Sequence, residues 1–364
     1  MKKLKSPDLS VEKDFCLSEL YKTLAKALAV LAFASAVPAA QALEPIDDAN
    51  YTYEGGSGES ITIGEEFAYS DSTVADGKSA IYGNGKTVTL TAPDGKILLY
   101  GHYDSSDYSG NAVNYSGNAV NIRGGGAATL KANSGLTAVS VYSALNAYES
   151  GSITVVSSGD GVSGSTAVSN VIQSQNASAV RADQGGAVSL RARDGNELTG
   201  VRGIEAGGSG TVSVLAEKGG NTVAGTGILS GDSTVTDGGA GISAENYAKA
   251  TVTAETGSNS VSTAYNSAVI LSGNASLSMT AYGSNTFLSG ELTGTPADGC
   301  TNGDVLEVLD GSSVTVTAKT GDNILQGDAG HEKTSTNALW LRGSTGEFSA
   351  ENGTNRAEAA RVGI

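Results

Sequence analysis

Cysteine, histidine, proline and aromatic residues are all scarce in this sequence. It has two cysteines, two histidines, five prolines and one tryptophan in 364 residues, and aromatic residues make up 5% of it. Cys16 lies in a segment that we expect to be removed, so Cys300 is left alone and no intramolecular disulfide is expected in the mature chain. Two histidines and one cysteine are too few to indicate a zinc site, so we predict no metal and no cofactor.

Helical and nucleotide-binding patterns are also missing. From residue 192 onward no apolar residues recur at helical spacing, and glycine is too frequent there for helices. Arg123-Gly-Gly-Gly126 lies between strand-like runs and opens no helix, so it matches neither a phosphate-binding nor a dinucleotide-binding loop. The net charge is −16, and removal of residues 1–42, which carry +2, leaves −18. This acidity excludes nucleic acid as an expected electrostatic partner.

What the sequence does contain is a repeat. A short run that alternates small apolar and polar residues ends in alanine and is followed by a turn that ends in asparagine. The copies are Ala192–Asn196, Ala216–Asn221, Ala254–Asn259, Ala281–Asn285, Ala318–Asn323 and Ala350–Asn355. A second short apolar segment, such as 203–206, precedes each run. Each unit is therefore predicted to be strand, tight turn, strand, Gly-Asn turn and loop, with loop insertions explaining the uneven spacing.

The fold predicted from this repeat is all-β, a right-handed parallel β-helix, or β-solenoid, over residues 118–356. Equivalent strands stacked about 4.8 Å apart would satisfy one another's backbone hydrogen bonds. Valine, isoleucine, leucine and alanine would fill the interior, and the recurrent asparagines would form a hydrogen-bonded ladder. An antiparallel β-sandwich array is the alternative, because Gly-Asn turns also start hairpins. The irregular unit length and the few aromatic residues count against it.

Residues 1–42 are predicted to be a secretory signal peptide with an extended n-region. Lysines at 22 and 26 flank the apolar stretch 27–37, and Pro38 breaks it. Ala40-Gln-Ala42 supplies small residues for cleavage before Leu43. The apolar stretch is too short to span a bilayer, which needs about 20 residues. We therefore expect the mature chain to be exported.

Residues 43–117 are predicted to form a tyrosine-rich N-terminal cap and the first rungs of the solenoid. They contain eight of the 14 tyrosines and a tandem copy, 108–114 and 115–121. Larger side chains can close the open edge of a solenoid. The alternative is a contact surface for carbohydrate or protein, because tyrosine offers a rigid amphipathic face. Its candidate residues are Tyr100, Tyr103, Tyr108 and Tyr115.

No catalytic constellation is predicted. The tight carboxylate pairs that we single out lie at 47–48 and 104–107, where turn chemistry explains them. The segment 157–165 loosely resembles a nucleophile loop but has no compact Gly-Asp-Ser-Gly. The histidines, His102 and His331, show no spacing that would complete a catalytic triad.

A long signal peptide followed by a Gly-, Ser-, Thr- and Asn-rich, acidic, cysteine-poor solenoid resembles the passenger domain of Gram-negative autotransporters. The resemblance covers about residues 1–356 and rests on repeats such as 313–323. It implies export by inner-membrane secretion machinery, passage through an outer-membrane translocator barrel, and display at the cell surface or release outside the cell. Such proteins end in a barrel of alternating strands, which residues 357–364 do not supply. We expect a truncated end with the barrel missing from this chain, in preference to a barrel encoded separately.

Two functions remain open at this point. The favoured one is a non-enzymatic, adhesin-like passenger that binds a host or neighbouring-cell glycan or protein through the solenoid surface. The alternative is a secreted β-helix polysaccharide lyase or glycoside hydrolase that uses an acidic groove. The excess of acidic residues motivates the second, and the lack of a catalytic pattern favours the first.

Overall fold

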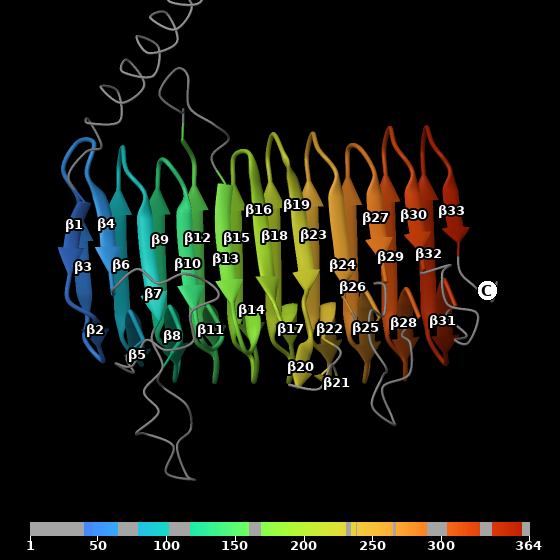
Figure 1. Ribbon diagram of the computed structural model, residues 1–364, viewed down its shortest axis with the longest axis horizontal. Coiled ribbons are helices and arrows are strands. Elements are labelled where there is room, and N and C mark those ends of the chain that lie inside the picture. Colours follow the sequence, from blue (N-terminus) through green and yellow to red (C-terminus); the bar gives the residue numbers. More distant parts are fainter. Residues whose placement is uncertain are drawn as a thin grey trace, which may run out of the picture. The chain divides into compact units, whose positions relative to one another are not determined.

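The computed structural model describes most of the chain as a stack of short parallel strands (Figure 1). The described residues are 40–64, 79–101, 117–159, 169–230, 234–237, 239–264, 267–289, 304–327 and 337–358. Nearly all of their strands belong to three sheets, here called A, B and C, and consecutive strands visit the sheets in that order. Each circuit of A, B and C is one rung.

The strands of each sheet pair in parallel with their equivalents one rung away. Sheet A contains β1 (Ala40–Leu43), β4 (Ser60–Ile63), β7 (Ile97–Gly101), β10 (Leu136–Ser140), β13 (Ser169–Ser174), β16 (Gly195–Gly200), β19 (Gly220–Gly225), β24 (Asn259–Thr263), β27 (Asn285–Leu288), β30 (Asn323–Gln326) and β33 (Asn355–Glu358). Sheet B contains β2 (Ile46–Asp47), β5 (Ile81–Asn84), β8 (Val120–Arg123), β11 (Leu145–Ala147), β14 (Ser178–Ala182), β17 (Arg202–Ala206), β22 (Ala240–Glu245), β25 (Val269–Ser272), β28 (Leu306–Leu309) and β31 (Leu339–Arg342). Sheet C contains β3 (Tyr51–Glu54), β6 (Thr87–Ala92), β9 (Ala127–Ala132), β12 (Ser152–Ser157), β15 (Ala187–Ala192), β18 (Thr211–Ala216), β23 (Lys249–Ala254), β26 (Ser276–Ala281), β29 (Ser313–Ala318) and β32 (Thr345–Ala350).

The predicted fold is confirmed: the chain is an all-β parallel β-helix. Within the described residues only β20 (Ile228–Ser230) and β21 (Thr234–Asp237) pair antiparallel, in the connection between β19 and β22. An antiparallel sandwich array is therefore wrong. The uneven repeat length comes mainly from connections of different length between sheet A and sheet B, as between Leu288 and Leu306.

The predicted repeat unit was incomplete. It placed a turn and a loop after the sheet C strand, but a third strand, in sheet A, lies there. Asn259 and Asn285 are the first residues of β24 and β27, and both side chains are buried. These asparagines point into the helix from strand positions and do not sit in the turn itself.

Period-2 alternation places small and β-branched side chains in stacked columns inside the helix. In sheet C one such column contains Val188, Val212 and Val314, each no more than 2% exposed. The column reaches Tyr51, which packs against the same core from the first described rung. Burying apolar side chains in this way contributes about 25 cal/mol for each Å² removed from water.

A continuous ladder of asparagines, all buried except the terminal Asn355, stiffens sheet A. Each ladder Nδ2 donates to the Oδ1 of the next member at 2.8–3.0 Å. The members are Asn170, Asn196, Asn221, Asn259, Asn285, Asn323 and Asn355. The second Nδ2 hydrogen of a member such as Asn221 reaches a backbone carbonyl, that of Thr253, at 2.7 Å. The amides are thereby satisfied without water.

Tight turns between sheets B and C hold the rungs in register. They use pairs of consecutive residues with positive φ, among them Gly208 with Ser209 and Gly273 with Asn274. Glycine and asparagine enter this left-handed region at the lowest cost. The predicted turns rich in Gly or Asn therefore lie where expected, between the two strands of the original repeat.

Candidate functional site

A row of mostly polar side chains runs along the outer face of sheet B, one from each rung between β8 and β31. Register aligns Glu205 with Arg181, and the residues flanking both in the strand are buried in the core. The same register continues in both directions. The members, here called the sheet B row, are Asn121, Asn146, Arg181, Glu205, Ser243, Ile270, Glu307 and Trp340. Parallel strands lie about 4.8 Å apart, so the row offers one side chain at each such interval.

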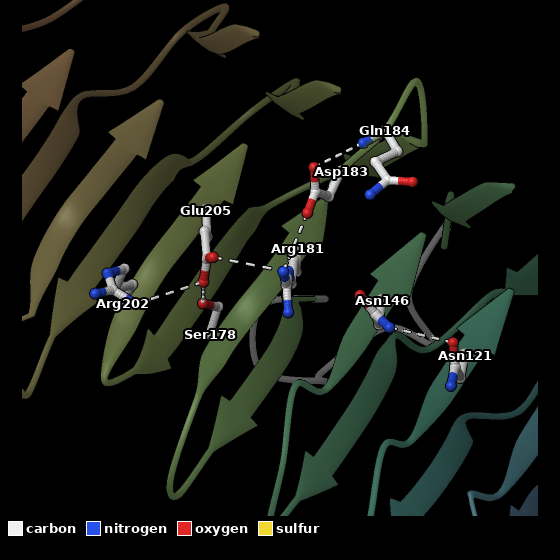
Figure 2. Close-up of polar contacts among 8 residues, drawn as sticks. All are labelled: Asn121, Asn146, Ser178, Arg181, Asp183, Gln184, Arg202 and Glu205. Carbon is white, nitrogen blue, oxygen red and sulfur yellow. Dashed lines mark hydrogen bonds and ion pairs between the residues drawn. The ribbon is translucent and has the colours of Figure 1, made fainter. Parts of the chain in front are cut away.

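Charged groups concentrate in the middle of the row (Figure 2). Arg181 Nη2 donates to Asp183 Oδ2 at 3.1 Å, and Arg181 Nε lies 3.7 Å from Glu205 Oε1. The other carboxylate oxygen of Glu205 accepts a hydrogen bond from Ser178 Oγ and lies 3.6 Å from Arg202 Nη1. About a third of the Arg181, Arg202 and Glu205 side chains remains exposed. Two cations and two anions balance, which suits a ligand that is not strongly charged.

Two amides continue the row beside this cluster. Asn146 Nδ2 donates to Asn121 Oδ1 at 3.1 Å (Figure 2). Among the described residues, neither Asn146 Oδ1 nor Arg181 Nε has a hydrogen-bond partner, although both atoms are buried. A buried polar atom without a partner costs free energy, so a water or a ligand hydroxyl that reached these atoms would be stabilised.

Carboxyl groups with altered acidity lie near the other end of the row. Asp304 is buried and accepts a hydrogen bond from the backbone N–H of Asn337 at 2.5 Å. Burial raises the pKa of Asp304 despite that hydrogen bond. Burial also raises the pKa of Glu307, the charge of Asp304 raises it further, and Ser267 and Arg342 oppose the change. A carboxyl group that holds its proton more readily can act as an acid.

The predicted tyrosine surface is not exposed where the structure describes it. Tyr100 is 5% exposed and packs with Val139 and Val141 on the outer face of sheet A, so its ring offers little contact area. Tyr103, Tyr108 and Tyr115 lie outside the described residues.

The predicted cleavage residues form a strand. Ala40, Ala42 and Leu43 belong to β1, which pairs in parallel with β4. Cleavage before Leu43 would leave only that residue of the four in β1. Cleavage stays a prediction, with the consequence that the mature chain would begin at the sheet A edge of the first rung.

Of the acidic, serine, histidine and cysteine residues considered as reactive groups in the sequence, some have structural roles and the others lie outside the described residues. Asp48 has a positive φ and accepts a hydrogen bond from the backbone N–H of Asn84, as a turn residue does. Ser157 is buried and donates to ladder Asn170. His102, His331, both cysteines and the pair 104–107 fall outside the described residues.

The described residues offer neither a cluster of metal ligands nor a membrane-spanning helix. No group of three or more histidine, cysteine, aspartate or glutamate side chains there could hold a metal ion. Nor does that part of the chain include a helix long and apolar enough to cross a membrane.

Comparisons with known proteins leave the site to be interpreted by its own chemistry. No protein-family model matches the chain, and no curated protein is significantly similar to it. The sheet B row was not singled out from the sequence, because its residue type changes from rung to rung. Only the strand register shows that Asn146, Arg181 and Glu205 are neighbours.

Proposed function

We propose that this chain is an exported, surface-displayed β-helix of the autotransporter passenger type, and that it binds an extended glycan along the sheet B row. It acts by binding, without catalysis. The observation that carries the proposal is the row itself. Arg181 and Glu205 together with Asn146 supply donors and acceptors from consecutive rungs.

A glycan suits this row better than a compact ligand does. The row is linear and repeats every rung, as the sugars of a polysaccharide repeat along the chain. Hydroxyl groups both donate and accept, so they fit a surface on which Arg181 and Arg202 alternate with Asp183 and Glu205. The balanced local charge gives no reason to expect a strongly anionic or cationic partner, although the whole chain is acidic.

Export is proposed on the sequence and is consistent with the stability of the fold. The apolar stretch 27–37 followed by Ala40-Gln-Ala42 supports a secretory signal. Inner-membrane secretion machinery and an outer-membrane translocator barrel are the partners that this route requires. A β-helix held by hydrogen-bond columns and apolar burial needs no disulfide to be stable outside the cell.

A glycan array probed with the purified full chain tests the proposal. We expect retention of a subset of glycans, a loss of at least tenfold in apparent affinity for Arg181→Ala, and no loss for Arg191→Ala. Arg191 is the matched control, because it is ion-paired with Glu217 but lies on sheet C. Equal loss in both variants, or a blank array, would contradict binding at the sheet B row. Cell binding that survives glycosidase treatment but not protease treatment would point to a protein partner instead.

One observation favours a second candidate function, cleavage of a glycan. The neighbouring carboxyl groups Asp304 and Glu307 both have raised pKa values, as a general acid would require. New reducing ends or unsaturated sugars, formed from the retained glycan and lost in Glu307→Gln, would support this candidate. An intact glycan after prolonged incubation would leave binding alone.

A further inference from the structure

The only tryptophan of the chain lies on the outer face of sheet B. Trp340 is in β31 and is 43% exposed, which is unusual for so large an apolar side chain. Its neighbours Leu339 and Leu341 align with core residues of β28, so alternation along the strand directs the indole outward. Leu341 is exposed because no described strand pairs with that edge of β31.

Charged groups lie on the same face of sheet B as the indole. Register places Glu307 directly across from Trp340 on the neighbouring strand. Arg342, two residues further along β31, lies on the same face and contacts both carboxylate oxygens of Asp310, at 3.2 and 3.4 Å. The charge of Arg342 lowers the pKa of Glu307, against the effect of burial. The indole thus has one carboxylate directly across from it and an Arg342–Asp310 pair further along the same face.

We propose that Trp340 and Glu307, together with Arg342 and Asp310, form a subsite for one pyranose ring at one end of the sheet B row. The inference rests on the proposed glycan-binding function and deepens it. One face of a pyranose ring presents C–H groups that pack on an indole, while its hydroxyl groups point to the sides. Carboxylates and a guanidinium on the same face of the sheet give those hydroxyls charge-assisted hydrogen bonds.

Other ligands fit these residues less well. A cationic group would be attracted to an indole beside carboxylates, but Arg342 on the same face would repel it. A purely apolar partner would leave the charged side chains on this face without water. A hydroxyl-rich ring satisfies the indole, the donor and the acceptors together.

Tryptophan fluorescence tests the subsite directly, because Trp340 is the one source of tryptophan emission in the sequence. The full chain is titrated with methyl glycosides of glucose, galactose, N-acetylglucosamine and glucuronic acid. We expect at least one of them to give a saturable change in emission and protection from acrylamide quenching. Millimolar affinity is sufficient for a single ring. No change with any of the four glycosides, up to the highest soluble concentration, would overturn the subsite.

Two variants separate binding from misfolding. Glu307→Gln is expected to lower the affinity for the glycoside by at least tenfold. The emission spectrum of the unliganded chain should stay unchanged. Glu347→Gln removes an exposed carboxylate on sheet C of the rung that contains Trp340, and this variant is expected to titrate as the original chain does. Equal weakening in both variants would contradict the assignment. A positive glycan array with a silent Trp340 would reject the subsite alone, whereas failure of both assays would reject the proposed function as well.

Discussion

Asn221 donates through Nδ2 to the Oδ1 of Asn259 at 2.8 Å, although the two residues are 38 positions apart in the sequence. The side chain of each is buried, so the bond is shielded from water. Every ladder asparagine between the ends accepts from one neighbour and donates to the next. One side-chain column thus couples the stability of adjacent rungs, which differ in length.

The ladder gives the first prediction. Asn259→Leu keeps the branching of the side-chain heavy atoms but leaves the Asn221 donor and the Asn285 acceptor without partners, at an expected cost of about 2 to 4 kcal/mol. Chemical denaturation followed by circular dichroism measures it, with the transition checked for more than one step because repeat arrays can unfold in parts. The control is Asn176→Leu at an exposed position, where we expect a change within about 0.5 kcal/mol. Equal stability of the two variants would contradict the ladder's role.

The second prediction concerns a close backbone approach. A Cβ at Gly257 would lie 2.1 Å from the carbonyl oxygen of Gly219, one rung away, so the backbone itself would have to move. We expect Gly257→Ala to lower the free energy of unfolding by about 1 to 3 kcal/mol, the usual cost of overpacking. At Gly56 the added Cβ would meet only the end of the Glu59 side chain, at 3.2 Å. Gly56→Ala should therefore leave the melting temperature nearly unchanged, and a similar loss in both would argue against steric conflict.

The third prediction is a pH dependence of stability. Burial, and then the charge of Asp304, raise the pKa of Glu307 above its ordinary value of 4.5. The folded state then holds more protons than the unfolded state from about that pH up to the folded pKa, so stability falls as pH rises through this window. Glu307→Gln cannot ionise. The difference in melting temperature between this variant and the original chain should therefore be larger, in favour of the variant, at a pH of about 7 than at a pH of about 4.

Glu347→Gln, which removes an exposed carboxylate on β32, is the control for this measurement. Its difference from the original chain should be the same at both pH values. A constant difference for Glu307→Gln as well would contradict the buried environment of that carboxyl group.

The fourth prediction concerns export. If the signal sequence is cleaved before Leu43, the chain recovered outside the inner membrane begins at that residue. Intact-mass measurement and N-terminal sequencing of the secreted chain check this outcome. A chain that begins at Met1 or Lys2 would contradict the signal peptide, and Ala42→Asp, which places a charge at the cleavage position, should slow processing.

Much of the fold could be predicted because the repeat shows the alternation of a half-buried strand and a turn at a fixed place after it. Runs such as Thr211–Ala216 alternate small apolar and polar residues. An asparagine equivalent to Asn221 follows shortly after a glycine in each later unit. The sheet A strands were missed because several, such as Asn285–Leu288, are only four residues long. The first rungs were harder to recognise. There the ladder column is occupied by Ile97 and Leu136, so the asparagine signal is missing.

The candidate site could not be predicted in the same way. Its residues share a position and not a type, as Arg181, Glu205 and Trp340 show. The sequence indicated a tyrosine-rich segment as the contact surface instead. Composition does not show whether a ring is exposed, and Tyr100 packs against valines. Register across connections of different length is a three-dimensional property, and it is what brings the sheet B row together.

Hydroxyl-radical footprinting tests most directly whether a glycan lies along the outer face of sheet B. The chain is oxidised briefly with and without the glycan that the array retains best, and labelling is measured for individual residues by mass spectrometry. Trp340 and Ile270 belong to the row, whereas Tyr282, 47% exposed, follows a sheet C strand and serves as the internal control. We expect the glycan to slow oxidation of Trp340 and Ile270 and to leave Tyr282 unchanged. Protection of Tyr282 alone, or of none of the three while the glycan is bound, would contradict binding at the sheet B row.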